Sequence, residues 1–201
     1  MTAADDDGKA STLKMNYWEQ WGLHTEICPC DVHFNEWVEA NAIRNKTIYH
    51  FGTGTHHIIG RHQAESGTGN VVFAITASKG EYDAYVSLII ENARVAKSYL
   101  VYFGDIYLSN ARLLPDFDVV TLFHLCEYFS PDTASEPYGG IDDRGLLDLF
   151  TAKTKPGGYI LFYQGSNGFD KTQPVIATWE KERPVERAGD FKTLLVYRKT
   201  A

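Results

Sequence analysis

The sequence contains no long hydrophobic run, few cysteines and no excess of positive charge. No apolar stretch approaches the roughly 20 residues that a membrane-spanning helix needs, so no association with a membrane is expected. The formal net charge is -7, which argues against nonspecific binding to nucleic acid or to anionic lipid. The three cysteines, Cys28, Cys30 and Cys126, are too few for a disulfide framework and favour a reducing cytoplasm as the setting.

The chain does have ample apolar material for one core. Of its 201 residues, 44% are hydrophobic and 22% are charged, proportions that are typical of a soluble globular protein. Residues 1–14 predict a flexible acidic tail. Residues 15–45 contain three tryptophans and a helical segment from Asp31, the expected N-cap, to about Arg44, so they predict a helical cap. Residues 46–201 are expected to form the main domain, and the sequence leaves homodimer formation open.

Strand-like apolar segments alternate with helical segments in the main domain. Strands are expected at residues 47–51, 71–76, 98–103, 117–125, 159–163 and 191–198. Helices are expected between the glycine-rich turn and residue 65 and over residues 81–96, 142–154 and 174–181. This alternation predicts an α/β fold with a doubly wound, mostly parallel sheet. Ligands of such sheets bind beyond the carboxyl ends of the strands.

A glycine-rich turn follows the first predicted strand. Gly52 and Gly54 lie in "FGTGTHH", where glycine allows backbone N–H groups to approach a ligand closely. A phosphate-binding P-loop requires a Lys followed by Ser or Thr, and none follows here. A dinucleotide fingerprint requires a third glycine at position 57, where the sequence has His57. Neither pattern therefore identifies the kind of ligand that the turn would bind.

The order of the motifs along the chain is more informative. The relevant stretches are "IYHFGTGT", "VVFAITAS", "VYFGDIYL", "FDVVTLFHLCEYF" and "LLDLFTAKTKPGGYILFY". In this order and spacing the chain resembles the class I S-adenosylmethionine-dependent methyltransferases over residues 47–165. The resemblance implies a Rossmann-like fold and methyl transfer from S-adenosylmethionine to a small molecule.

The resemblance also implies a set of cofactor-binding positions. The glycine turn would hold the amino-acid and ribose parts of the cofactor, the end of the second strand would meet the ribose hydroxyls, and Asp105 would accept a hydrogen bond from the adenine amino group. These positions are His50, Gly52, Thr53, Gly54, Thr55, Thr76, Asp105, Ile106 and Phe123. His124 and Glu127 are the candidate catalytic residues, because a base assists transfer to an O–H or N–H group. Tyr17, Trp21 and Tyr128 are candidates for the substrate pocket.

Three residues depart from the family pattern. His50 stands where the family usually has an acid, and His56 replaces the third glycine of the loop. The acid that binds the ribose is replaced by Thr76 or by its neighbour Ser78. Each change removes interactions of on the order of 1–3 kcal/mol. The departures keep an alternative open, in which the protein has this fold but acts without catalysis as a binding or scaffold partner. Glu81 is near enough in sequence to compensate for the acid missing at Thr76.

Two groups of metal-competent side chains occur in the sequence. His24, Cys28, Cys30 and His33 form H-x3-C-x-C-x2-H, and four further histidines lie between residues 50 and 62. The first spacing is unlike the usual zinc knuckle, and the second group has no evident carboxylate partner. A tight turn and ordinary packing are therefore expected, and no metal site is predicted.

Overall fold

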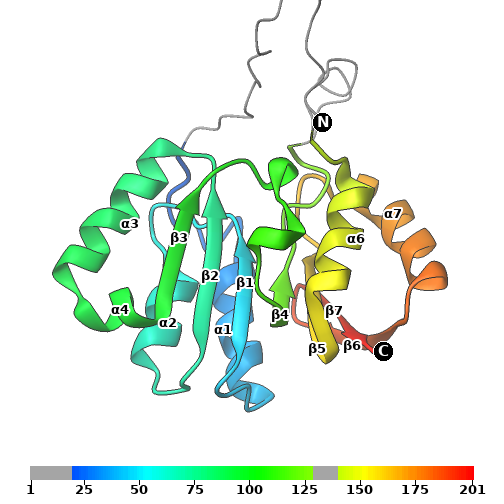
Figure 1. Cartoon of the computed structure of the whole chain (residues 1–201), viewed down its shortest axis with the longest axis horizontal. Coiled ribbons are helices and arrows are strands. Elements are labelled where there is room, and N and C mark those ends of the chain that lie inside the picture. The colour runs from blue at the N-terminus through cyan, green and yellow to red at the C-terminus, as the bar shows by residue number, and fades with distance from the viewer. Residues whose placement is uncertain (1–19, 129–139) are drawn as a thin grey trace, which may run out of the picture.

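The computed structural model describes residues 20–128 and 140–201. Strands and helices alternate along most of the chain (Figure 1). The strands are β1 (Thr47–Phe51), β2 (Val71–Thr76), β3 (Tyr99–Phe103), β4 (Phe117–Thr121), β5 (Thr154–Tyr163), β6 (Val185–Phe191) and β7 (Leu194–Lys199). The helices are α1 (Cys30–Ala40), α2 (Ile58–Glu65), α3 (Lys79–Glu91), α4 (Ala93–Ser98), α6 (Asp143–Lys153) and α7 (Phe169–Glu182), with short 3-10 helices η1 (Ile106–Leu108) and η2 (Ala111–Leu113).

The strands form one sheet of seven, in the order β3-β2-β1-β4-β5-β7-β6. Five neighbours from β3 to β5 pair in parallel, whereas β7 is antiparallel to both β5 and β6. The chain runs outward from β1 to β3 and then returns to β4 on the other side of β1. This order creates a switch point between β1 and β4, where the loops after the two strands diverge. The prediction of a doubly wound, mostly parallel α/β sheet is confirmed.

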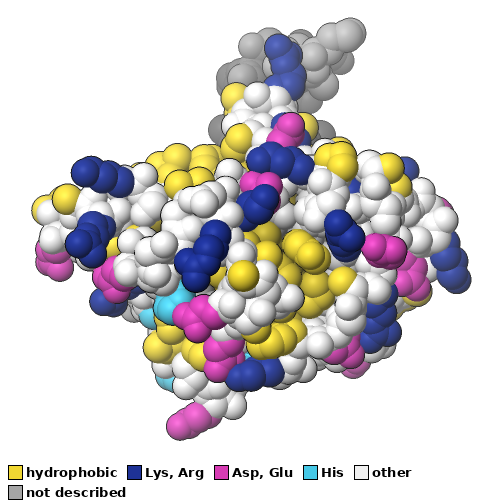
Figure 2. All heavy atoms as spheres, turned by 90° about the horizontal axis from the view of Figure 1, so that it is seen from below, with side chains coloured by type: hydrophobic (Ala, Val, Ile, Leu, Met, Phe, Trp, Pro, Cys, Tyr) yellow, Lys and Arg dark blue, Asp and Glu magenta, His cyan; other side chains and the backbone are white. Residues whose placement is uncertain are grey.

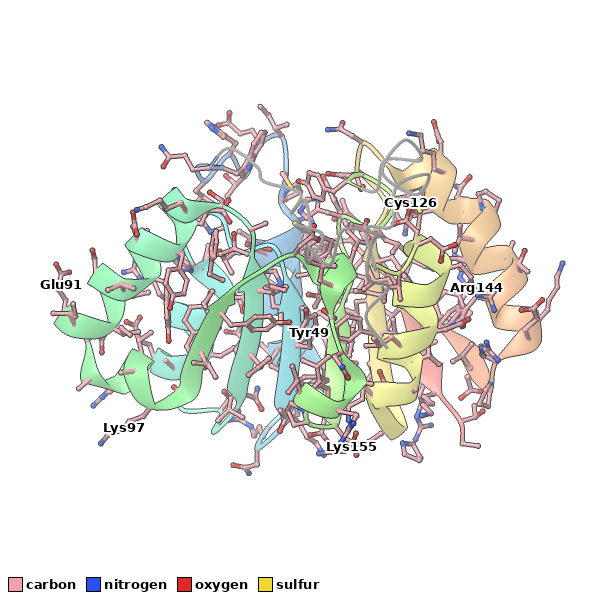
Figure 3. All side chains as sticks on the ribbon, turned by 45° about the horizontal axis from the view of Figure 1, so that its top comes forward. Tyr49, Glu91, Lys97, Cys126, Arg144 and Lys155 are labelled. Atoms are coloured by element: carbon pink, nitrogen blue, oxygen red, sulfur yellow. The ribbon has the colours of Figure 1, made fainter. Side chains whose placement is uncertain are left out.

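Helices cover both faces of the sheet because each central strand buries side chains on both sides. Tyr49 points to the face beneath α6 and α7, where it packs on Phe150 with ring centroids 4.1 Å apart (Figure 3). Its neighbour Ile48 points to the opposite face, in one cluster with residues of α1, α2 and α4. The alternation of Ile48, Tyr49 and His50 along β1 therefore sends His50 toward the face that α1 covers.

Helix α1 is built into this core, since Phe34 and Trp37 are buried beside the sheet. The prediction that Asp31 caps this helix is wrong. The helix begins one residue earlier, after Pro29, and no side chain caps it. Asp31 therefore lies in the first turn, where its side chain is turned inward and buried.

Other predicted boundaries differ for identifiable reasons. The helix expected over residues 81–96 is broken at Asn92, whose side chain accepts hydrogen bonds from two N–H groups of α4. The strand expected to reach residue 125 ends at Thr121, and residues 122–128 form turns. Strand β6 was not predicted, because its only large apolar side chains are Val185 and Phe191 at its two ends, and most residues between them are exposed at the sheet edge.

Within residues 20–128 and 140–201, no helix is long and apolar enough to cross a bilayer. Figure 2 shows basic and acidic side chains interspersed on the face it presents. The predicted tail at residues 1–14 lies outside the described residues.

Candidate active site

A cleft with two lobes lies at the carboxyl edge of the sheet. The larger lobe has a volume of about 780 Å³ and is lined by residues that follow β1 to β5. The smaller lobe has a volume of about 150 Å³ and extends toward the start of α1. Both lobes are lined by Trp21, His24, Gly52, Glu81, Glu127, Tyr128 and Asn167. They are therefore two parts of one cleft, which spans the switch point between β1 and β4.

The segment before α1 crosses the cleft and is held there by its backbone. The carbonyl of Trp21 accepts a hydrogen bond from Thr55 N–H at 2.7 Å, and Trp21 N–H donates to Glu81 Oε1 at 3.1 Å. Further along, the Tyr163 hydroxyl donates to the carbonyl of Ile27 at 3.2 Å. The Trp21 side chain remains half exposed, at 50%. This segment thus forms a strap over the cleft.

Glu81 supplies a buried carboxylate at the end of β2. Its Oε2 accepts hydrogen bonds from Thr76 Oγ1 at 2.6 Å and from Thr53 Oγ1 at 3.2 Å. The sequence Ser78-Lys79-Gly80-Glu81 matches a capping box, in which Glu81 would reach back to Ser78 N–H. In the structure Ser78 N–H donates to Thr76 instead, so the carboxylate of Glu81 is directed into the cleft.

The glycine turn has the left-handed backbone that glycine favours, with φ of 84° at Gly52 and 54° at Gly54. The side chain of His56 folds back against Gly54, where an added Cβ would collide with the ring. His57 also has positive φ, and its ring is buried between the Tyr99 hydroxyl at 2.9 Å and the Glu81 carbonyl at 2.8 Å. Burial lowers the pKa of His57 to about 4. The two histidines therefore fill space beneath the turn as neutral rings.

His50 and Asp31 approach each other beneath the smaller lobe. His50 Nδ1 shares a hydrogen bond with Thr121 Oγ1 at 2.9 Å. Its Nε2 is buried with no hydrogen-bond partner among the described residues and lies 3.9 Å from Asp31 Oδ1. Burial lowers the pKa of His50 well below its ordinary value and raises the pKa of Asp31 to about 7. The carboxyl group absent at position 50 is thus found nearby on α1.

His124 and Glu127 form a hydrogen-bonded pair after β4, with Nδ1 and Oε2 3.1 Å apart. Burial opposes the charge on both residues, but their mutual attraction raises the pKa of His124 and lowers that of Glu127. The other Glu127 oxygen accepts a hydrogen bond from Ser166. Glu127 is therefore fixed from two sides and orients the imidazole, leaving Nε2 as the free ring nitrogen.

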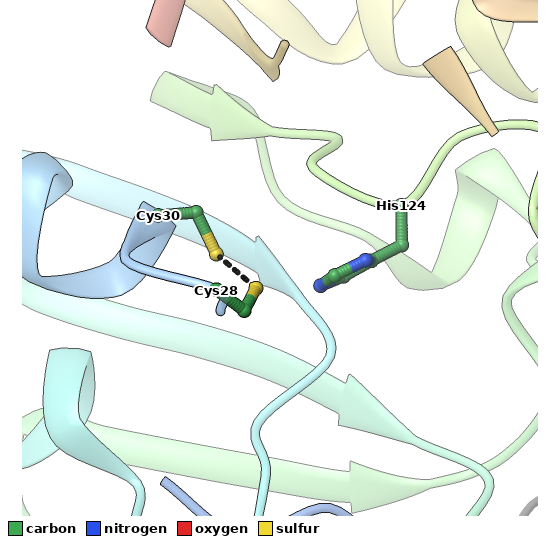
Figure 4. A group of neighbouring side chains, drawn as sticks. All are labelled: Cys28, Cys30 and His124. Atoms are coloured by element: carbon green, nitrogen blue, oxygen red, sulfur yellow. Dashed lines mark hydrogen bonds between the residues drawn. The ribbon is translucent and has the colours of Figure 1, made fainter. Parts of the chain in front are cut away.

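The same imidazole faces two thiols from the start of α1 (Figure 4). Cys28 Sγ and Cys30 Sγ are 3.4 Å apart. The hydrogen bond between the two sulfurs lowers the pKa of Cys28 to about 6 and raises that of Cys30. His33 of the predicted H-x3-C-x-C-x2-H group is instead bonded to Thr193 Oγ1 at 2.8 Å. That group therefore does not assemble as one unit.

Asp105 follows β3 and lines the larger lobe beside Ile106. It is 5% exposed, and its Oδ1 accepts a hydrogen bond from Tyr107 N–H at 2.9 Å, which caps η1. This bond fixes the carboxylate at the rim of the sheet. Asp105 and Glu81 place two acidic side chains along the larger lobe.

The structure brings most of the predicted site residues to the cleft. Those that line it are Trp21, Gly52, Gly54, Thr76, Asp105, Ile106, His124, Glu127 and Tyr128. Thr53 and Thr55 instead bond Glu81 and Trp21, as described above. Phe123 lines neither lobe, because it is 1% exposed and packs against Phe34 with centroids 6.1 Å apart. Tyr17 lies outside the described residues.

Comparison with known proteins bears on the fold. No protein-family model and no curated protein sequence matches the chain. The methyltransferase CcbJ from Streptomyces caelestis has a TM-score of 0.63 at 13% identity, covering 93% of this chain and 99% of its own. The N-methyltransferase NodS from Bradyrhizobium japonicum, solved with S-adenosyl-L-homocysteine, has a TM-score of 0.56 at 11% identity and 85% coverage of each chain. The cyclase SpnF has a TM-score of 0.56 at 16% identity, covering 91% of this chain and 67% of its own.

These similarities define the fold as that of the class I S-adenosylmethionine-dependent methyltransferases, as the sequence resemblance predicted. A cyclase is among the similar structures. The fold by itself therefore does not determine the reaction, which has to be argued from the cleft.

Proposed function

We propose that the protein transfers a methyl group from S-adenosylmethionine to a small molecule. The observation that carries this proposal is the arrangement of the cleft. Its larger lobe holds two buried carboxylates, from Glu81 and Asp105, and its smaller lobe contains the His124–Glu127 pair. The structure of NodS, which contains S-adenosyl-L-homocysteine, supports the choice of cofactor.

The larger lobe fits an adenosine group. Its volume of about 780 Å³ lies within the ~300–1,000 Å³ typical of small-molecule sites. A carboxylate has about four lone-pair sites, and Glu81 uses three of them for Thr53, Thr76 and the strap. Its remaining site can accept a ribose hydroxyl, while Asp105 can accept from the adenine amino group and Ile106 can pack on the ring. Glu81 would thus replace the acid absent at position 76.

The smaller lobe suits the acceptor. S-adenosylmethionine supplies an electrophilic methyl group on a sulfonium sulfur. Transfer to an O–H, N–H or S–H group requires a positioned acceptor and a site for its proton. His124 Nε2 can take that proton, because Glu127 holds the ring through Nδ1 and stabilises the resulting charge. Trp21 and Tyr128 border both lobes and would restrict the access of water.

Calorimetric titration with S-adenosylmethionine and S-adenosylhomocysteine tests the proposal. We expect dissociation constants below about 100 μM, which corresponds to more than about 5 kcal/mol of binding free energy. Glu81→Gln should weaken binding by about tenfold through loss of one charged hydrogen bond. Glu91→Gln is the matched control, because Glu91 is exposed at the far end of the same helix (Figure 3). No heat at millimolar ligand would overturn the proposal.

The alternative of a non-catalytic binding partner is supported by the glycine turn. His56 occupies the space beside Gly54, and Thr55 N–H is already bonded to Trp21. Incubation with S-adenosylmethionine and pooled small phenols, amines and thiols separates the two functions. Formation of S-adenosylhomocysteine that His124→Gln abolishes supports catalysis, whereas binding without turnover supports the alternative. A small-molecule acceptor, the lack of nucleic-acid binding, homodimer formation and a cytoplasmic location stay predictions.

A further inference from the structure

The thiols of Cys28 and Cys30 have no role in the proposed methyl transfer, although they lie beside His124. The ligand atoms of the three residues all lie within 4.8 Å of one another, and the two sulfurs are 3.4 Å apart. Both cysteines are free thiols. They come from the start of α1, while His124 comes from the turn after β4, so the fold alone assembles the group (Figure 4).

The spacing suits a tetrahedral metal ion. With zinc–sulfur bonds of about 2.3 Å, two thiolates of a tetrahedral site lie about 3.8 Å apart. The observed 3.4 Å requires only a small separation of the sulfurs. Thiolate and imidazole ligands select zinc over magnesium or calcium, which prefer oxygen ligands.

The surroundings of His124 are those of a metal-ligating histidine. Ligating imidazoles almost always donate their second N–H to a carboxylate or carbonyl, which fixes the ring and its tautomer. Here Glu127 Oε2 holds Nδ1 at 3.1 Å, and Ser166 holds the other Glu127 oxygen. The ring is therefore positioned with Nε2 toward the thiols (Figure 4).

A second observation is the buried carboxyl group of Asp31 beside the thiols. Asp31 Oδ1 accepts a hydrogen bond from Cys30 Sγ at 3.5 Å and lies 3.9 Å from His50 Nε2. That nitrogen is buried and has no hydrogen-bond partner among the described residues. The other carboxyl oxygen, Asp31 Oδ2, lies 3.8 Å from His56 Nδ1, so a buried carboxyl group adjoins both the thiols and two imidazoles. A divalent cation bound to the thiolates would compensate the acidic groups there.

We propose that Cys28, Cys30 and His124 bind Zn²⁺ and leave its fourth coordination position open to the smaller lobe. Three protein ligands with an open position are typical of catalytic rather than structural zinc. The open position can take water or a thiol, hydroxyl or amine group of a small molecule. The site changes the role of His124, because in the zinc-loaded protein Nε2 is a ligand and cannot accept a proton. Deprotonation of the acceptor would then be promoted by zinc.

Metal titration of the reduced, metal-free full-length protein tests this site without any methyl donor. We expect one Zn²⁺ per chain by competition with a chromophoric chelator. One Co²⁺ should give the ligand-field and thiolate charge-transfer absorption of a tetrahedral site. Cys28→Ser and Cys30→Ser should each remove the charge-transfer band. Glu127→Gln should retain the band and weaken zinc binding by about 10–100-fold, the usual effect of losing a carboxylate that orients a ligating histidine.

Two control variants and one measurement on the unaltered protein complete the test. Cys126→Ser removes a thiol outside the cluster, and His33→Gln removes a histidine of the same sequence motif that is bonded to Thr193, so both should bind metal like the unaltered protein. Zinc should also protect the partly exposed Cys28 from alkylation, as measured by mass spectrometry. Absence of binding at micromolar zinc, or binding that survives loss of both Cys28 and Cys30, would overturn the site. Neither outcome depends on cofactor binding, so this proposal and the proposed function fail separately.

Discussion

The two lobes of the cleft differ in how the chain builds them. The larger lobe is formed by segments that directly follow the parallel strands, and its buried acids bond to hydroxyl and N–H groups of the same loops. The strap covers both lobes, but the smaller lobe also depends on the start of α1, which brings thiols and a carboxyl group close to His50 of β1 and His124 of the turn after β4. The two lobes therefore share the strap, and the smaller lobe differs in its dependence on side chains at the start of α1.

The largest expected effect concerns the acid of the larger lobe. Glu81→Ala leaves two buried hydroxyls and the Trp21 N–H without their acceptor. We expect the free energy of unfolding to fall by about 3–5 kcal/mol, since hydrogen bonds to charged groups contribute ~1.5–3 kcal/mol each and partial rebonding recovers some of the loss. Urea denaturation measures this change. Glu91→Ala should have almost no effect, and equal effects of the two variants would show that the Glu81 carboxylate is not part of a buried network.

The next effect concerns the histidines beneath the glycine turn. The pKa of His57 is lowered from 6.5 to about 4 in the folded state, first by burial. The unfolded chain therefore binds more protons between these values, and stability present above pH 6.5 is lost as pH falls through 4. The loss from His57 alone is about 3 kcal/mol. His57→Asn keeps a residue that tolerates positive φ but removes the titration.

Denaturation curves of both proteins at several pH values between 7 and 4 measure this difference. We expect the variant to lose less stability on acidification than the unaltered protein. Identical pH dependence in the two proteins would mean that His57 titrates normally. An NMR titration of the ring in the folded protein provides the second check.

The difference between the two lobes also explains which parts of the fold and of the cleft could be predicted from the sequence. Alternating apolar segments predicted the parallel sheet, and the positions after the strands predicted Gly52, Asp105 and His124 as cleft residues. Glu81 was noted only because it is close to Thr76 in the sequence. The S-x-x-E pattern at the start of α3 is typical of a side chain that caps the helix, and the Glu81 carboxylate does not do so. Phe123 was expected beside the cofactor, but strand β4 ends at Thr121 and the ring of Phe123 is buried against Phe34.

The smaller lobe could not be predicted in the same way. Cys28 and His124 are distant in sequence, and only the packing of α1 against the sheet brings them together. The spacing of His24, Cys28, Cys30 and His33 suggested a local group, but a hydrogen bond to Thr193 holds His33 away from the cysteines. Contacts of this kind depend on where an added helix docks, and local patterns do not encode that position.

The smallest expected effect concerns the hydrogen bond that holds the strap to Tyr163. Tyr163→Phe removes the hydroxyl that donates to the carbonyl of Ile27 at 3.2 Å but keeps the ring. We expect the free energy of unfolding to fall by about 1 kcal/mol or less, the usual contribution of one neutral hydrogen bond.

Because Ile27 adjoins Cys28, local opening of the strap in this variant should accelerate alkylation of Cys28 by up to about fivefold. Cys126, which lines the larger lobe but not the smaller one, is the internal control. Mass spectrometry of both thiols measures the two rates, and parallel acceleration of both would indicate global loosening instead of strap opening.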